Sequence, residues 1–103
     1  MTDREAQFKQ LVAQYPDSPM GHFSLGKLYL EQQRWAEAAE SFAQAVKLDP
    51  KYAAAFVALG DAWAGAGEPA RARGAWEQAL QTPLGKKDAS LQTDLASRIA
   101  DLE

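Results

Sequence analysis

Apolar residues recur at helical spacing along most of the chain, with polar positions between them. The opening segment shows this pattern in four residues followed by a proline: Phe8, Leu11, Val12, Tyr15 and Pro16. Such spacing puts the apolar side chains on one face of a helix, and the proline disfavours a helical conformation in the residue before it. β-branched residues never form an alternating run, so the pattern predicts helices and no strands.

Four further helices are expected between this segment and the last quarter of the chain. Their predicted bounds are about 19–32, 35–48, 52–66 and 69–82. Short polar or glycine-containing turns separate them. Pro69 suits a first helical position, where the N–H that proline lacks would have no helical partner.

The last segment predicts a terminal amphipathic helix after a break at 84–87. Its apolar stripe consists of Leu91, Leu95, Ile99 and Leu102. Its other face is polar: Gln92, Asp94, Ser97, Arg98 and Asp101. A stack of helices needs a terminal helix with a polar outer face to cover its last apolar surface. The chain is therefore predicted to be all-α, with about six helices.

The sequence also repeats itself at one fixed spacing, a period of about 34 residues. Leu25-Gly26 is followed one period later by Leu59-Gly60, and Phe42 by Trp76. The register extends backwards as well, because Phe8 stands one period before Phe42. Several further positions match in the same register: Tyr29 with Trp63, Ala38 with Ala72, Ala45 with Ala79, and Pro16 with Pro50.

These matches resemble the tetratricopeptide repeat, a helix–turn–helix unit with the pattern Trp-x2-Leu-Gly-x2-Tyr, then Ala, Phe, Ala and Pro. The resemblance implies a right-handed α-solenoid of antiparallel helical hairpins. It divides a single domain, 1–103, into four parts: an N-terminal helix resembling half a repeat (1–16), two repeats (19–50 and 53–84) and a C-terminal capping helix (87–102). Two residues depart from the family pattern: His22 takes the leading aromatic place, and Pro83 comes one residue early.

In this family the first helix of each hairpin lines a concave groove that holds a peptide or a helix of a partner. The resemblance implies eight groove residues here: Met20, Phe23, Lys27, Leu30, Ala54, Val57, Asp61 and Ala64. Some members grip the terminal carboxylate of a chaperone tail with several basic and amide residues. Phe23, Ala54 and Ala58 stand where such residues would be expected, so no clamp of that kind is predicted.

Composition and charge exclude several other partners. The net charge is -3 and basic residues are dispersed, which argues against binding to nucleic acid. With no cysteine, disulfides and thiolate metal sites are excluded, and nothing indicates a cofactor or a metal. No segment is apolar and long enough for a membrane span, and no apolar core of a signal peptide follows Met1, so a cytoplasmic location is expected.

Catalytic chemistry also has little support in the sequence. His22 is the single histidine and takes a core aromatic place, so no catalytic residue is predicted. Gly65 and Gly67 lie in a hairpin turn rather than in a phosphate-binding loop. Trp35 lies outside the aromatic places of the repeat, and it either packs over the turn or forms an exposed anchor.

Three functions remain at this point. The first is a non-catalytic protein-interaction module, an adaptor or assembly factor that binds a peptide or helix in the groove. The second is a structural module that associates with its own copies and has an inert groove. The third, remote, is a small enzyme. Whether the terminal helices leave the groove open or fill it is a separate question for the structure.

Overall fold

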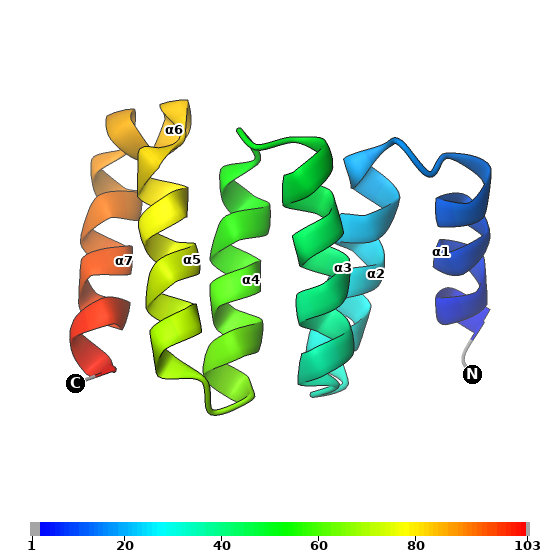
Figure 1. Cartoon of the computed structure of the whole chain (residues 1–103), viewed down its shortest axis with the longest axis horizontal. Coiled ribbons are helices and arrows are strands. Elements are labelled where there is room, and N and C mark those ends of the chain that lie inside the picture. Colours follow the sequence, from blue (N-terminus) through cyan, green and yellow to red (C-terminus); the bar gives the residue numbers. More distant parts are fainter. Residues whose placement is uncertain (1–2, 103) are drawn as a thin grey trace.

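The computed structural model describes residues 3–102, which form seven helices and no strand. Their bounds are Asp3–Gln14 (α1), Pro19–Glu31 (α2), Trp35–Leu48 (α3), Ala53–Gly65 (α4), Pro69–Gln81 (α5), Pro83–Lys87 (α6) and Ala89–Asp101 (α7). Long neighbouring helices run antiparallel and line up from one terminus to the other, forming a single stack (Figure 1). The stack is 37 Å along its longest axis and 18 Å along its shortest. The all-α solenoid expected from the sequence is thus confirmed.

The two hairpins, α2–α3 and α4–α5, turn in the same way. Gln33 and Gly67 have positive φ angles of 59° and 77°. In each turn the next residue donates its N–H to a carbonyl five residues back: Arg34 to Tyr29 and Glu68 to Trp63, both at 2.9 Å. This hydrogen bond satisfies a carbonyl that the end of the helix would otherwise leave unpaired.

Close contact between the helices of a hairpin depends on two glycines. A Cβ on Gly26 would lie 2.6 Å from the Phe42 ring, and a Cβ on Gly60 would overlap the Trp76 indole. Trp76 also donates its Nε1–H to the carbonyl of Val57 at 3.1 Å. The helix-propensity cost of each glycine, ~1 kcal/mol, is therefore offset by the packing of an aromatic ring.

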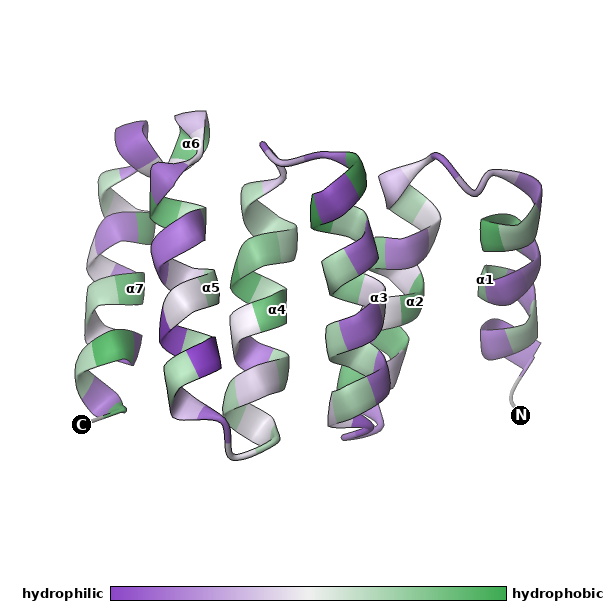
Figure 2. Cartoon of the chain, in the orientation of Figure 1, coloured by the Kyte–Doolittle hydropathy of each residue, from purple (hydrophilic) through white to green (hydrophobic). Residues whose placement is uncertain are grey.

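Two apolar clusters form the core. The central cluster contains these buried residues of α2, α3 and α4: Leu25, Tyr29, Ala38, Ala39, Phe42, Ala58 and Ala62. The C-terminal cluster contains Ala72, Trp76, Ala79 and Leu95. Trp63 packs against both clusters, so they form one continuous core. Helix α4 lies between α3 of the first hairpin and its own hairpin partner α5, and it has few hydrophilic positions (Figure 2).

The structure adds one short helix, α6, to the six that were expected, and this helix takes up the expected break at 84–87. Thr82 starts this helix: its Oγ1 accepts a hydrogen bond from the Gly85 N–H at 3.1 Å and donates one to the Ala79 carbonyl at 2.7 Å. Pro83 takes the first helical position. The early proline therefore starts a new turn of helix instead of ending one.

Trp35 packs rather than standing free. A Cβ on Gly65 would lie 2.5 Å from the Trp35 ring, which shows that the indole rests on the end of α4. Of the two interpretations left open by the sequence, the structure favours packing, with the contact made to the end of α4.

Helix α1 is attached to the stack by small apolar contacts and by ion pairs. Val12 Cγ2 would lie 3.2 Å from a Cβ on Gly21. Glu5 is only 4% exposed and binds Arg34 at 2.7 Å and Lys9 at 3.1 Å. Because both cations donate to the Glu5 carboxylate, Arg34 more strongly, they hold its pKa below the ordinary value.

Candidate functional site

A groove of about 390 Å³ lies on the side of the stack formed by α2, α4 and α7. We call it the α2–α4–α7 groove. It is lined by Phe23, Lys27, Ala53, Ala54, Val57, Ala58, Asp61, Leu84, Asp88, Leu91 and Arg98. Residues four apart on a helix share one face, which places Phe23 and Lys27 of α2 beside Val57 and Asp61 of α4.

Five of the eight residues expected from the family resemblance line this groove: Phe23, Lys27, Ala54, Val57 and Asp61. Met20 stands at the start of α2 and is 60% exposed, with its sulfur 3.9 Å from the Tyr52 hydroxyl. Leu30 is half-buried against the central cluster, and Ala64 is half-buried against the C-terminal cluster.

An aromatic group supports the end of the groove where α2 and α4 begin. The Phe23 ring is stacked on Tyr52, with centroids 4.9 Å apart, and tilted against Phe42 at 5.7 Å. Burial raises the pKa of the Tyr52 hydroxyl, and Asp49 adds to this effect. Phe23 therefore serves the fold as well as the groove surface. The groove is apolar here, because Ala54, Val57 and Leu84 line it together with Phe23.

The two charged residues expected in the groove have different environments. Asp61 accepts a hydrogen bond from Arg98 of α7 at 2.5 Å, and Arg98 also binds Asp94 at 3.1 Å. Burial opposes the Arg98 charge, but Asp61 and then Asp94 outweigh it, so the Arg98 pKa is raised. Lys27 is exposed, with its Nζ 6.0 Å from the Phe23 ring centroid.

Helix α7 is a wall of the groove rather than only a cap, and this is a correction. Arg98 was expected on the outer polar face, but it is half-buried, turned toward α4, and 5.9 Å from the Trp76 ring. The groove remains open beside it.

Six groove residues were not among those expected from the sequence: Ala53, Ala58, Leu84, Asp88, Leu91 and Arg98. The repeat register contained a signal for three of them. Asp88, Leu91 and Arg98 stand one repeat period after Ala54, Val57 and Ala64. Helix α7 thus occupies the place of the first helix of a third unit. Leu84, on the short helix α6, had no such signal.

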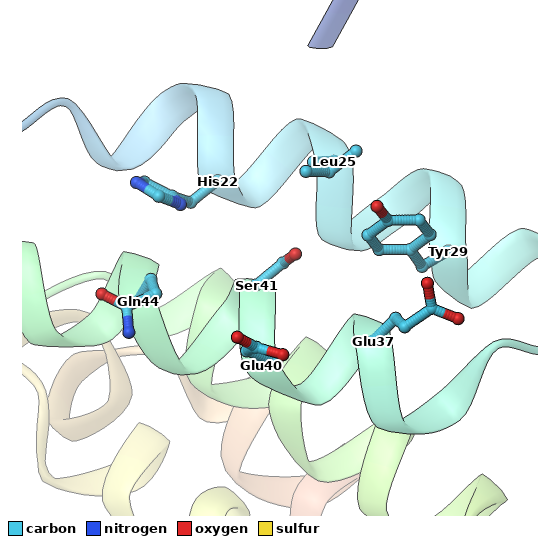
Figure 3. Close-up of a pocket in the computed structure, with 7 residues that line it drawn as sticks. All are labelled: His22, Leu25, Tyr29, Glu37, Glu40, Ser41 and Gln44. Atoms are coloured by element: carbon cyan, nitrogen blue, oxygen red, sulfur yellow. The ribbon is translucent and has the colours of Figure 1, made fainter. Parts of the chain in front are cut away.

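A second hollow of about 270 Å³ lies between α2 and α3 (Figure 3). It is lined by His22, Leu25, Tyr29, Glu37, Glu40, Ser41 and Gln44. His22 stands where the next repeat has Phe56, and its Nε2 lies 3.3 Å from the Pro16 carbonyl oxygen, so an N–H there donates to Pro16. The imidazole is therefore hydrogen-bonded to the backbone that precedes α2.

Residues 3–102 contain neither a cluster of metal-ligating side chains nor a helix suited to span a membrane. No group of three or more histidine, cysteine, aspartate and glutamate side chains is placed to hold a metal ion. Within the same residues, no helix combines the length and the apolar character needed to cross a membrane.

Comparisons with known proteins agree with this architecture. A family model described as tetratricopeptide repeat matches residues 5–53 and 23–89. The TPR repeat-containing protein PA0015 of Pseudomonas aeruginosa is 35% identical over 95 residues, which are 92% of this chain and 90% of that protein. The solution structure of protein BPP2914 from Bordetella parapertussis superposes with a TM-score of 0.79 at 29% identity, covering 99% of this chain and 89% of that one.

A further relative is much longer. The cytochrome c-type biogenesis protein CycH of Pseudomonas aeruginosa is 31% identical over 87 residues, which are 84% of this chain but only 17% of that protein. The match to the family model and the identity with PA0015, which extends over most of both chains, establish the family. The chain belongs to the tetratricopeptide repeat family.

Proposed function

We propose that this chain is a non-catalytic protein-interaction module that holds a peptide or helix of another protein in the α2–α4–α7 groove. The observation that carries the proposal is that residues implied by the family resemblance are also residues that line the groove. The family resemblance names residues from the first helices of both hairpins, and five of them line one open groove with an apolar floor. Binding sites that bury a few apolar anchors in such a groove are a recurring way to recognise peptides.

An adaptor or assembly role is the finer part of this proposal. It is supported by the similarity to CycH, a cytochrome c-type biogenesis protein, of which this chain covers 17%. A module of this size would act by bringing a bound segment to a larger assembly.

The test uses two substitutions at equivalent places in two helices. Ala54 and Ala70 are both exposed and are the second residues of α4 and α5, but only Ala54 lines the groove. Glutamate suits the first turn of a helix, so Ala54→Glu and Ala70→Glu should both fold. A library of short displayed peptides is selected on the wild-type protein, and the selected peptides are measured by fluorescence anisotropy.

We expect Ala54→Glu to weaken binding of the selected peptides about tenfold or more, because it places a charge in the apolar floor. Ala70→Glu should bind as the wild type does. The proposal is wrong if no peptide is selected, or if the selected peptides bind equally well to Ala54→Glu.

Self-association is the second candidate, and exposed apolar residues on α1 favour it. Leu11 is 37% exposed and Tyr15 is 59% exposed. Sedimentation of the wild type and of Tyr15→Lys over a wide concentration range tests this candidate. A wild-type molecular mass that rises with concentration, and that Tyr15→Lys returns to the monomer value, would support it. A monomer at every concentration would exclude it.

A further inference from the structure

The α2–α4–α7 groove is divided into an apolar part and a charged part. Phe23, Ala54, Val57, Leu84 and Leu91 form the apolar part. They lie mostly on the first two turns of their helices, at the end of the stack where α2, α4 and α7 begin. One turn further along, α2 and α4 carry charged residues instead. A ligand side chain in the apolar part would therefore have charged groups beside it.

The charged side chains of the groove other than Lys27 are already engaged within the chain. Asp61 is bound to Arg98 at 2.5 Å, and Arg98 is also bound to Asp94. Asp88 caps α7, since its Oδ1 accepts a hydrogen bond from the Leu91 N–H at 3.0 Å. A ligand would have to break one of these interactions to use the group.

Lys27 is the exception. Among residues 3–102 no carboxylate lies within ion-pair distance of its ammonium group, which lies 6.0 Å from the centroid of the Phe23 ring. The groove therefore offers one cation that is available to a ligand, one helical turn from the apolar floor. An anion placed there gains an ion pair without displacing another anion.

The size of the groove limits what enters it. A volume of about 390 Å³ is near the lower end of the range for ligand pockets, about 300–1,000 Å³. The floor at Ala53, Ala54 and Ala58 is made of small side chains, which leaves room above it for a bulky one. The space fits one or two side chains of a peptide rather than the surface of a folded domain.

We propose that the groove recognises an internal segment of a partner protein in which an aliphatic or aromatic side chain lies within four residues of an aspartate or glutamate. The apolar side chain packs between Phe23 and Val57, and the carboxylate binds Lys27. This inference rests on the proposed function and specifies the chemistry of the bound segment. The carboxylate belongs to a side chain and not to a chain terminus, because Phe23, Ala54 and Ala58 stand where family members that grip a terminal carboxylate carry basic and amide residues.

The experiment selects short peptides displayed so that both of their ends are joined to the carrier or lack a free carboxylate. Selection is carried out in parallel on the wild type, on Lys27→Glu and on Lys47→Glu. Lys47 is an exposed lysine on α3 that does not line the groove, so its reversal changes the net charge equally and leaves the groove intact.

We expect the wild type and Lys47→Glu to select peptides enriched in acidic residues within four positions of an apolar one. Lys27→Glu should lose that enrichment. For one selected peptide, made with an amidated C-terminus, replacing its acidic residue by the matching amide should weaken binding to the wild type about fivefold at low salt. The same replacement should have no effect on binding to Lys27→Met.

Two results would overturn the inference. One is selection of peptides without acidic enrichment, and the other is an equal effect of the acid-to-amide replacement on the wild type and Lys27→Met. If such peptides still lose affinity for Ala54→Glu, the groove binds peptides and only their acidic character is wrong. If no peptide is selected at all, the proposed function and this inference fail together.

Discussion

Single residues decide how closely the helices approach, and the glycines separate into two kinds. Gly60 leaves no room for a methyl group, because the Trp76 indole occupies its surface. Gly74, in the middle of α5, is exposed and has no atom within 4 Å of a Cβ built on it. The same substitution should therefore have opposite effects at the two positions.

We expect Gly74→Ala to raise the free energy of unfolding by ~1 kcal/mol, because alanine is the better helix former. Gly60→Ala gains the same propensity but must displace an indole that donates to the Val57 carbonyl, so a net loss of ~2 kcal/mol is expected. Urea unfolding followed by circular dichroism measures both. Stabilisation by both substitutions would show that the ring moves aside at little cost.

Gln33 presents another residue-scale test, because it adopts a backbone conformation that its equivalent, Gly67, adopts without strain. Its φ of 59° lies in the left-handed region, as does the 77° of Gly67. Gln33→Gly should stabilise the protein by ~0.5–1 kcal/mol, the left-handed cost being partly offset by the greater entropy of glycine in the unfolded chain. The reverse change, Gly67→Gln, should destabilise it by a similar amount. Urea unfolding of both variants tests the symmetry, and a loss of stability in Gln33→Gly would contradict it.

Among the elements, α6 depends most on one side chain. Thr82 is buried, and its hydroxyl makes two hydrogen bonds, to the Ala79 carbonyl and from the Gly85 N–H. Thr82→Val keeps the shape but leaves both partners unsatisfied, so a loss of ~1–2 kcal/mol is expected. Thr82→Ser keeps the hydroxyl and should cost less. Hydrogen exchange at the Gly85 amide gives the local readout: it should become faster in Thr82→Val and change little in Thr82→Ser.

Helix α1 is the element most sensitive to acid. Arg34 and Lys9 lower the pKa of Glu5, and Arg34 lowers that of Glu37, from an ordinary value of 4.5. The unfolded chain therefore takes up protons at higher pH than the folded chain does. The ion pairs contribute fully above pH 4.5, and the contribution is lost as pH falls below that value toward the lowered pKa.

We expect the wild type to be more stable than Glu5→Gln at neutral pH, and the two proteins to become equally stable in acid. Urea midpoints at a series of pH values measure the difference. Glu77→Gln is the control, since Glu77 is exposed and its carboxylate makes no ion pair within residues 3–102; it should follow the wild type at every pH. A difference between wild type and Glu5→Gln that persists unchanged into acid would exclude the ion pairs as its cause.

The elements also show how far the sequence could be interpreted. Helix bounds such as 35–48 and 69–82 could be predicted to within about a residue, because proline, glycine and the apolar period mark them independently. Helix α6 could not, because its start depends on the rotamer of the Thr82 hydroxyl rather than on any apolar pattern. In the groove, the family resemblance implied Phe23 and Val57, whereas the Arg98–Asp61 pair depends on how a long side chain crosses between helices.

At the scale of the whole molecule, the stack is held together by contacts between neighbours, so the end helices are the test of cooperativity. In repeat stacks, stability is approximately a sum of units and of the interfaces between them. Here α7 covers α5 through Leu95, which is fully buried, and Trp63 links that cluster to the central one. If this link is strong, a defect at the end should weaken the entire chain.

Leu95→Ala should therefore lower the free energy of unfolding by ~2–5 kcal/mol, the range for removing a buried leucine side chain, in a single transition. Leu84→Ala, at a leucine that is 53% exposed, should cost less than ~0.5 kcal/mol. Circular dichroism reports all helices, whereas hydrogen exchange at the backbone amides of α3 reports a hairpin helix that has no residue in the cluster around Leu95. Coincident urea curves from the two probes mean that α7 and the hairpins unfold together. If helix content in Leu95→Ala falls at lower urea than that at which the α3 amides lose protection, α7 detaches alone, and the third wall of the groove is then a separable element whose loss can be compared directly with peptide binding.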